Sequence, residues 1–320
     1  MTETTVPARL FAASGSLCGL TAWLVLVLSP AHAETLILPP ADIDLVGHSR
    51  VVAARQEDTL LDIARRFDIG QDEIVLANRQ VDRWLPGDKT PVLIPSRYIL
   101  PRAERRGIIL NVPEMRLYYF PPAVAGTPEE VQTYPVSIGR MDWSTPLGST
   151  RIAAKIRNPA WRPPASIRAE AAAGGEPLPE RIPPGPNNPL GDYALRLALP
   201  GYLIHGTNRP YGVGMRVTHG CIRMYPEDIE ALFPQVETGT RVHIVNQPVK
   251  IGWLFNTLYI EVHPPLEEQD SDADALFATA MDMINTAWAQ RRFELDAPAL
   301  KAALGRRDGL PTPIGRARSE

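Results

Sequence analysis

The chain contains little cysteine and carries little net charge. Two cysteines, Cys18 and Cys221, occur in 320 residues, and the formal net charge is −3. A charge this small gives no reason to expect nucleic acid or an anionic membrane surface as a partner. Two thiols form at most one disulfide, so the role of each cysteine becomes the main question.

Residues 1–33 have the pattern of a secretory signal peptide. Arg9 precedes an apolar run over 10–28, and Ala31-His32-Ala33 is a small-x-small cleavage site. Because the run is about long enough to cross a bilayer, an uncleaved inner-membrane anchor is the alternative. Cleavage removes Cys18 and leaves Cys221 unpaired in an oxidising compartment. Such a cysteine is either an intermolecular staple or a reactive thiol, and its neighbours favour the thiol.

Proline is abundant, at 33 residues or about twice average usage. This content argues against a helical bundle and favours turns and short strands. Hydrophobic residues make up 44% and charged residues 22%, which is ordinary for a soluble globular protein. The length suits two modest domains with extensions.

Residues 48–95 are predicted to form a small domain. The apolar spacing after Thr59 is that of an amphipathic helix. Thr59 with Asp62 three residues later is a helix-capping arrangement. The expected elements are, in order, a strand at 51–53, two short helices over about 60–67 and 72–78, and a strand at 92–94.

Residues 106–246 change to a strand pattern. Short apolar runs separated by turn residues predict a mainly β domain, either a β-sandwich or an open barrel. Residues 174–191 are dense in Gly, Pro and Asn, which predicts a long loop that serves as a lid or a substrate-binding edge. One short helix is expected from Pro226 onward. The candidate strands cover 108–111, 116–120, 134–138, 150–156, 195–198, 202–205 and 241–246.

The remainder is expected in two pieces. Residues 247–265 read as a strand extension, with a pair of strands at 251–253 and 258–262. In the tail, 266–320, an amphipathic helix is predicted over 272–293. Residues 305–320 are rich in Gly, Pro, Arg and Ser and are expected to be disordered. The apolar face of the helix is predicted to consist of Phe277, Ala280, Met281, Ile284 and Trp288.

The most informative stretch is 202–225, which holds Cys221. His205 lies sixteen residues before the cysteine, and His219 lies two residues before it. A thiol attacks as thiolate and therefore needs a base or a positive environment, which a histidine held by the fold supplies. Gly220 lets the backbone turn sharply and leaves room for a substrate carbonyl. These residue types predict a cysteine acyl-transfer site.

This stretch resembles a known enzyme motif. Thr218-His219-Gly220-Cys221-Ile222-Arg223, with His205-Gly206-Thr207 upstream, is similar to the catalytic motif of L,D-transpeptidases, the YkuD-type enzymes of bacterial cell-wall assembly. Segments such as Thr145-Pro146-Leu147-Gly148 resemble the ErfK-type Gram-negative branch. Residues 48–95 resemble a LysM module, a small glycan-binding fold, although Glu57 stands where that family usually has glycine.

The resemblance implies a place and a reaction. The enzyme would be periplasmic and would bind peptidoglycan, with the glycan on the LysM-like module. Cys221 would attack the carbonyl between diaminopimelate and D-alanine of a stem tetrapeptide, release D-alanine and leave a thioester. An amine would then resolve the thioester, either the lysine of an outer-membrane lipoprotein or a second stem peptide in a 3→3 cross-link. No cofactor and no metal is required.

The resemblance also implies roles for individual residues. His205 would take the thiol proton and later serve the acceptor amine, and Arg223 would bind a substrate carboxylate in a bidentate way. His219 is a third candidate catalytic residue, with a purely structural role as the alternative. For Arg223, a solvated or core-pairing arginine is the alternative. The residues expected to line the substrate or oxyanion site are Thr218, Gly220, Gly206 and Tyr202, with Tyr211 as a further candidate.

Three alternatives remain open at this stage. His205, His219 and Cys221 could in principle bind zinc, although no fourth cysteine or HExxH-type helix is evident. The chain could be a non-catalytic wall-binding protein that depends on its LysM-like unit. Water could also resolve the thioester, which would make the enzyme a carboxypeptidase or an amidase.

Overall fold

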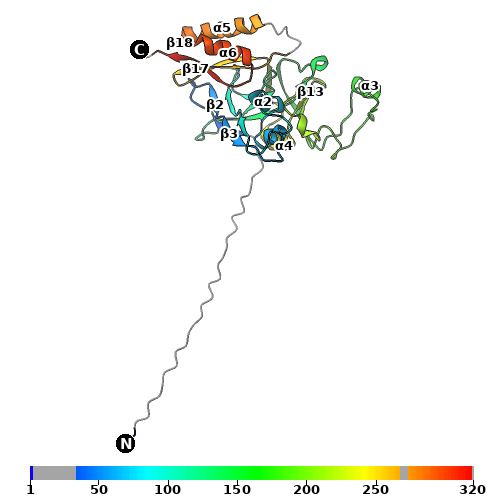
Figure 1. Ribbon diagram of the computed structural model, residues 1–320. Coiled ribbons are helices and arrows are strands. Elements are labelled where there is room, and N and C mark those ends of the chain that lie inside the picture. The colour runs from blue at the N-terminus through cyan, green and yellow to red at the C-terminus, as the bar shows by residue number, and fades with distance from the viewer. Residues whose placement is uncertain (3–33, 267–272, 319–320) are drawn as a thin grey trace. The chain divides into compact units, whose positions relative to one another are not determined.

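The computed structural model describes residues 1–2, 34–266 and 273–318 (Figure 1). The predicted signal peptide therefore lies outside the described residues. In the described part, no helix has both the length and the apolar character needed to span a membrane.

The catalytic-domain region is built on one curled nine-stranded sheet, so the mainly β prediction is confirmed. Neighbouring strands are antiparallel except for two parallel pairs, β6 with β15 and β12 with β14. A separate parallel pair joins β9 and β13. The strands in sheet order are β1 (Glu34–Ile37), β8 (Glu130–Pro135), β7 (Arg116–Phe120), β6 (Gly107–Asn111), β15 (Arg241–Val245), β10 (Gly148–Arg157), β11 (Tyr193–Leu197), β12 (Leu203–His205) and β14 (Ile222–Arg223), and the separate pair is β9 (Ile138–Gly139) and β13 (Arg216–Thr218).

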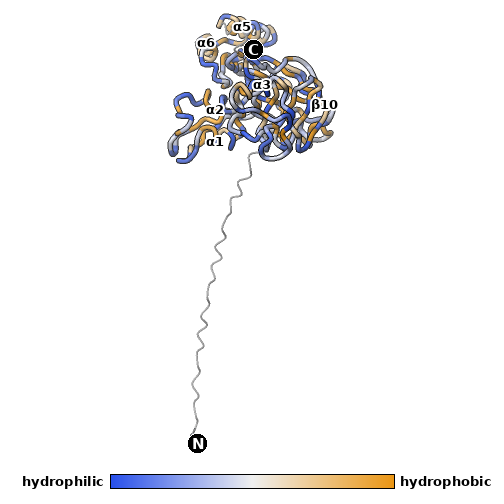
Figure 2. The backbone as a smooth tube through the Cα atoms, turned by 90° about the vertical axis from the view of Figure 1, so that its right-hand side faces the viewer, coloured by the Kyte–Doolittle hydropathy of each residue, from blue (hydrophilic) through white to orange (hydrophobic). Residues whose placement is uncertain are grey.

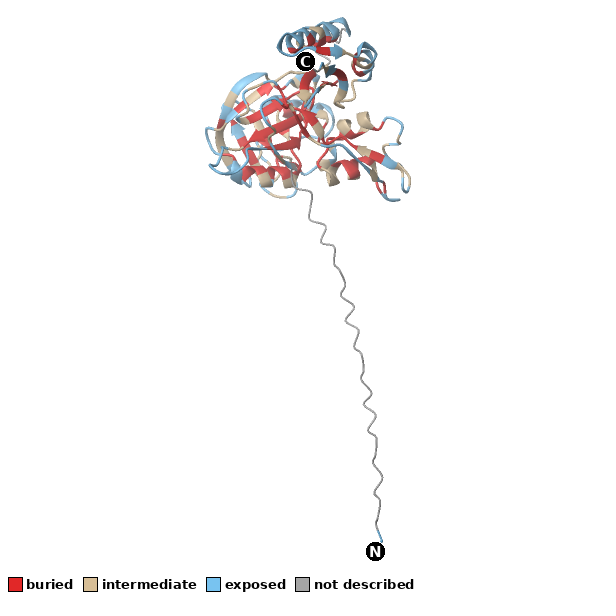
Figure 3. Cartoon of the chain, turned by 90° about the vertical axis from the view of Figure 1, so that its left-hand side faces the viewer, coloured by how far each residue is buried: buried red, intermediate tan, exposed pale blue. Residues whose placement is uncertain are grey.

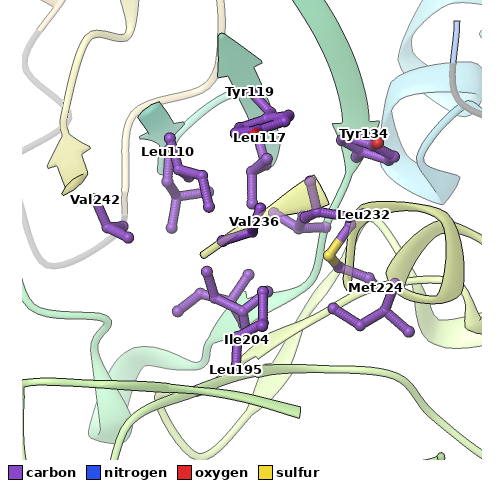
Figure 4. Close-up of a cluster of buried hydrophobic side chains, with 14 of the residues drawn as sticks. Leu110, Leu117, Tyr119, Tyr134, Leu195, Ile204, Met224, Leu232, Val236 and Val242 are labelled. Carbon is purple, nitrogen blue, oxygen red and sulfur yellow. The ribbon is translucent and has the colours of Figure 1, made fainter. Parts of the chain in front are cut away.

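Helix α4 (Pro226–Gln235) closes the core of this sheet. Pro226 occupies its first turn, followed by two acidic residues that suit a helix N-terminus. The inward stripe is Ile229, Leu232 and Phe233, as the sequence predicted. Figure 4 shows Leu232 and Val236 meeting side chains from several strands in a buried cluster. Since α4 begins just after Cys221, this packing fixes one end of the cysteine loop.

Two features of this region differ from the expectation of one short helix. A further helix, α3 (Ala165–Ala173), lies within the long connection between β10 and β11. Its alanine-rich sequence has high helix propensity but buries only Ile167, so the apolar periodicity that marks most helices is absent. Two 3₁₀ turns, η1 (Met141–Trp143) and η2 (Pro210–Gly212), also flank the nucleophile region.

The N-terminal module has the expected strand, helix, helix, strand order. Thr59 and Asp62 form a reciprocal capping box at the start of α1. The module has its own small apolar core. Its elements are β3 (Arg50–Ala53), α1 (Leu60–Arg66), α2 (Gln71–Ala77) and β4 (Pro91–Ile94), flanked by the paired strands β2 (Leu45–Gly47) and β5 (Arg97–Ile99). Its resemblance to a glycan-binding LysM module stays a prediction.

Polar contacts join this module to the catalytic domain. Arg65 of α1 donates two hydrogen bonds to Glu227 of α4, at 2.7 and 3.0 Å. Buried Arg116 of β7 pairs with Glu73 of α2 at 2.6 Å. The Tyr225 hydroxyl donates to the Ile69 carbonyl at 3.1 Å. Tyr225 and Glu227 follow the segment of Cys221 closely in the chain. The contacts of the N-terminal module with these two residues therefore hold the C-terminal end of that segment in place.

The C-terminal part forms one unit instead of an extension plus a tail. Its four-stranded antiparallel sheet crosses the boundary expected at 265/266, and α5 and α6 bury their apolar sides against one common core (Figures 1 and 2). The unit comprises β16 (Val249–Leu254), β17 (Thr257–Val262), α5 (Ala273–Gln290), β18 (Phe293–Leu295), α6 (Ala297–Arg306) and β19 (Thr312–Ala317).

Two sequence predictions for this unit are wrong. Residues 305–320 were expected to be disordered, but β19 pairs with both β17 and β18. Backbone hydrogen bonds hold this strand, and its composition does not reveal them. The predicted apolar face of α5 is wrong in part: Ala280 and Ile284 are buried and Met281 packs partly on the core, but Phe277 and Trp288 are about half exposed, and Leu276 and Ala287 are buried instead. Figure 3 shows both buried and exposed residues on the helices near the C-terminus.

Candidate active site

The fold brings Cys221 and His205 onto neighbouring strands. Strand β14 begins immediately after Cys221 and pairs in parallel with β12, with Ile204 opposite Ile222 and His205 opposite Arg223. The cysteine therefore enters the sheet beside the strand that ends at the histidine. The sixteen residues between β12 and β14 contain η2 and β13. This connection returns the backbone so that β14 can run parallel to β12.

His205 is buried, and its ring orientation is fixed. Nδ1 lies 2.6 Å from the Gly206 carbonyl oxygen, and because a carbonyl only accepts, Nδ1 carries the hydrogen. Burial, reinforced by the positive charge of Arg223, lowers the pKa of His205 to about 4. At neutral pH the ring is therefore neutral, with Nε2 left as its proton-accepting atom.

Cys221 is partly exposed and sits in a largely apolar setting. Its Sγ lies 3.6 Å from the carbonyl oxygen of Gly201. Burial raises the pKa of the thiol, although a backbone hydrogen bond from Leu203 and the charge of Arg223 act in the opposite direction. The resting group is thus a thiol at neutral pH, and the imidazole of His205 on the neighbouring strand is neutral.

A network of hydrogen bonds shapes the nucleophile loop, which we define as residues 218–221. The Thr218 hydroxyl donates to the Cys221 carbonyl at 2.6 Å. The Thr145 hydroxyl donates to the Gly220 carbonyl at 3.0 Å and accepts from the Gly139 amide at 3.1 Å. Thr145 belonged to a segment that resembled the family, but its contact with the loop could not be read from sequence spacing.

Glycine is required at position 220. Its φ of +96° lies in the left-handed region, and a Cβ there would come within 2.9 Å of Cε1 of Tyr202. Tyr202 therefore lies against the nucleophile loop, and its role in lining the substrate site stays a prediction. Gly206 packs on α4, where a Cβ would meet Ile229 at 3.1 Å.

His219 points toward a carboxylate on α3. Its Nε2 lies 3.1 Å from Oε2 of Glu170, and its ring meets Trp143 edge-on at 5.3 Å between centroids. Glu170 also pairs with Arg140. The hydrogen bonds from Arg140 and His219 lower the pKa of Glu170. Sequence reasoning missed Glu170, Trp143 and Arg140 as neighbours of the loop.

Arg223 is a largely buried cation, and its Nε has no hydrogen-bond partner among the described residues. Burial lowers its pKa, and the nearby charge of Arg209 lowers it further. No ion pair to a carboxylate is present for it in the described part of the chain, which suits a site for an anionic group. Tyr211, in contrast, is exposed and lies among Leu61, Arg65 and Tyr225.

Zinc binding requires that the donor atoms of the ligands lie close to one another. In the described residues, one group of three or more acidic, histidine or cysteine side chains brings its donor atoms within 4.8 Å of one another: Glu114, Glu261 and His263. His205, His219 and Cys221 do not form such a group. The Lys250 ammonium lies 2.9 Å from Glu114 and 2.6 Å from Glu261, so a side-chain cation already neutralises these carboxylates.

The chain is similar to known proteins over almost its full length. The family described as YkuD, L,D-transpeptidase catalytic domain, matches residues 105–244. The protein named Probable L,D-transpeptidase YcfS, from Escherichia coli strain K12, is 38% identical over 293 residues, which cover 90% of both chains. Probable L,D-transpeptidase ErfK/SrfK of the same strain is 38% identical over 296 residues, covering 88% of this chain and 91% of its own.

The catalytic domain of the E. faecium L,D-transpeptidase aligns with a TM-score of 0.34 and 20% identity over 45% of this chain and 100% of that domain. The sequence similarity over almost the full length makes the protein an enzyme of the YkuD class. The chain belongs to the L,D-transpeptidase family, whose activity is on peptidoglycan.

Proposed function

We propose that the protein is a periplasmic L,D-transpeptidase that acts on peptidoglycan stem tetrapeptides through a Cys221 thioester. The observation that carries this proposal is the parallel pairing of β12 with β14, which sets the neutral, buried His205 beside the loop of the thiol. The N-terminal signal pattern supports export.

The first half-reaction forms the acyl-enzyme. Nε2 of His205 accepts the Cys221 proton while Sγ attacks the carbonyl between diaminopimelate and D-alanine. The tetrahedral intermediate collapses with cleavage of the C–N bond, and the imidazolium returns the proton to the departing D-alanine amine. A thioester remains. Thr218, His219 and Gly220 hold the loop in the shape that exposes backbone donors to the developing oxyanion.

The second half-reaction transfers the acyl group to an amine. The acceptor nitrogen attacks the thioester, His205 takes the proton that the amine loses, and cleavage of the C–S bond regenerates the thiol. Arg223 suits the free carboxylate of a stem peptide, because its buried guanidinium has no carboxylate partner in the described part of the protein. The acceptor is the lysine of an outer-membrane lipoprotein or a second stem peptide.

The N-terminal module is proposed to hold the glycan strand. Trp84 and Leu85 are exposed next to Pro86, in the connection after α2, and an exposed indole offers a flat surface for a sugar ring. Its firm attachment through Arg65 and Arg116 would keep glycan and stem peptide in a fixed relation to the thiol. A packing module without a ligand is the alternative.

Intact-mass analysis of the purified protein tests the proposal. Incubation with a diaminopimelate tetrapeptide or a carbapenem should give a covalent adduct that is absent in Cys221→Ala. With the tetrapeptide, adding an amine acceptor should then yield the transfer product, whereas a hydrolase would yield only the free tripeptide. Folded wild-type protein that forms no adduct would contradict the nucleophile assignment and leave wall binding as the function.

A further inference from the structure

Residues 158–192, which we call the insert, connect two adjacent antiparallel strands. Strands β10 and β11 pair up to Arg157 opposite Tyr193, so a short turn would be enough to join them. The chain instead leaves the sheet and carries α3 clear of it (Figure 1). A long connection of this kind usually has a function of its own.

The base of the insert is firmly held. Buried Asn188 donates to the carbonyls of Pro159, at 2.7 Å, and Pro183, at 3.1 Å, and its side-chain oxygen accepts from the Leu190 amide at 2.9 Å. Trp161 and Ile182 exchange two backbone hydrogen bonds across the base. The base therefore sets the direction in which α3 projects.

Helix α3 itself is weakly held. It buries only Ile167, so apolar packing contributes little to its position. Its Arg168 pairs with Glu180 inside the insert, which does not anchor it to the body. Among the described residues, Glu170 is the one side chain of α3 that hydrogen bonds to side chains outside the insert, and its carboxylate accepts these bonds.

The two partners of Glu170 are part of the nucleophile loop or hydrogen bonded to it. His219 belongs to the nucleophile loop and directly precedes Gly220 and Cys221. Arg140 lies on the neighbouring segment, where its amide donates to the Thr218 carbonyl at 3.0 Å. One carboxylate thus bonds to both segments that shape the loop around Cys221. It is acceptor-only when ionised, so His219 must donate from Nε2, which fixes the orientation of that ring.

We propose that Glu170 is a positioning residue: its carboxylate holds His219 and Arg140 in place and thereby fastens α3 at the edge of the nucleophile loop. The proposal rests on the transpeptidase function only for its effect on turnover. The contacts are solvent-exposed ion pairs, which break and re-form easily. The contacts of Glu170 with His219 and Arg140 can therefore break and re-form during a catalytic cycle while the base of the insert stays folded.

The matched pair Glu170→Ala and Glu180→Ala tests this inference. Both changes remove one carboxylate that pairs with an arginine, but only Glu170 reaches the nucleophile loop. Amide hydrogen exchange over 165–173 should be about three- to tenfold faster in Glu170→Ala and unchanged in Glu180→Ala. High salt should accelerate exchange more in the wild type than in Glu170→Ala, because screening weakens ion pairs and the variant keeps only the Arg168–Glu180 pair on α3. Equal exchange in the two variants would overturn the proposal.

Turnover supplies the readout that a merely structural contact would not change. With the tetrapeptide and an amine acceptor, Glu170→Ala should lower kcat by about three- to tenfold with little change in KM, because the loop geometry and not substrate affinity is altered. Glu170→Asp, which keeps the charge, should recover most of the loss. A change in KM alone, or no rescue by Asp, would contradict a positioning role. If the wild type shows no transfer at all, the proposed function fails while hydrogen exchange still decides the inference.

Discussion

The carboxyl groups of Asp68 and Asp228 face each other in the interior of the protein, within hydrogen-bonding distance. Asp68 follows α1 of the N-terminal module, and Asp228 lies in the first turn of α4, just after the nucleophile region. Both oxygens of Asp68 and one oxygen of Asp228 have no other hydrogen-bond partner among the described residues. Two buried carboxylates this close repel each other, so the arrangement requires a shared proton.

This pair predicts that the protein loses stability as the pH rises. Burial raises the pKa of Asp68 to about 6, against the pull of Arg116, and raises the pKa of Asp228 further; Glu73 and Glu227 also face the pair. Both folded-state pKa values exceed the unfolded ones, so this stability is fully present below about pH 4 and is lost as the pH rises through 6. Asp228→Asn should be more stable than the wild type at pH 8 by about 1–3 kcal/mol.

Urea unfolding at pH 4.5, 6 and 8 measures this effect. Asp88→Asn is the control, because Asp88 is an exposed carboxylate on the same module. The wild type and the control should decline together, while Asp228→Asn declines less. Identical slopes for all three proteins would show that the pair does not share a proton.

The motif around Cys221 was predictable because its chemistry is local. One short stretch of sequence contains His205, His219, Gly220 and Cys221. The capping box of α1 likewise spans four residues. Such features depend on neighbours along the chain, which a sequence displays directly.

Features that depend on distant contacts were not predictable. Glu170 lies 49 residues from His219, and nothing in the alanine-rich sequence around it signals that contact. Strand β19 was expected to be disordered because its sequence contains Gly and Pro. Pairing of its backbone with β17 holds it in place, and the sequence does not display that pairing. For α5 the period and the burial of Ala280 and Ile284 were predicted correctly, but Phe277 and Trp288 lie outside the buried stripe, because only the packed sheet decides which stripe faces inward.

The low pKa of His205 predicts an unusual acid limb in the acylation rate. The imidazole must be neutral to accept the thiol proton, and burial lowers its pKa to about 4. The rate constant for acylation by a carbapenem should therefore not titrate near pH 6.5, where a free histidine would, and should fall only as the pH approaches 4. His205→Ala should lower the rate constant by about 10²–10⁴-fold. A wild-type midpoint near 6.5 would contradict the assignment of His205 as a buried neutral base.

Arg223 is predicted to recognise the free carboxylate of the substrate, in addition to its effect on the pKa of the Cys221 thiol. Arg223→Gln should raise KM for a tetrapeptide with a free carboxylate much more than for its amidated counterpart. Loss of one charge-assisted bidentate contact corresponds to about ten- to a hundredfold. Steady-state kinetics with both peptides measure the difference, and Arg106→Gln, an exposed arginine, serves as the control. Equal losses with the two peptides would assign Arg223 to the structure of the sheet.

The buried Lys250 is predicted to be essential for the C-terminal unit. Its ammonium contacts Glu114, Glu261 and the Ile99 carbonyl. The side chains of Lys250 and both glutamates are nearly inaccessible to solvent. Lys250→Met should destabilise the protein by about 3–5 kcal/mol, because it leaves two buried carboxylates without their cation. Lys89→Met, at an exposed position, should be neutral in the same urea titration. A small effect at Lys250 would mean that His263 takes over the neutralising role.

Gly220 gives a prediction in which backbone strain and side-chain contact can be separated. Gly220→Ala places a Cβ at φ +96°, within 2.9 Å of Tyr202, whereas Gly239→Ala meets the same φ of +96° with nothing within 4 Å. Both substitutions should cost about 1–3 kcal/mol of stability through backbone strain. Only Gly220→Ala should also slow acylation of Cys221, by about tenfold or more, because the loop must shift away from Tyr202. Urea titration and intact-mass kinetics on the two variants separate the effects; equal acylation rates would show that the contact with Tyr202 does not set the nucleophile geometry.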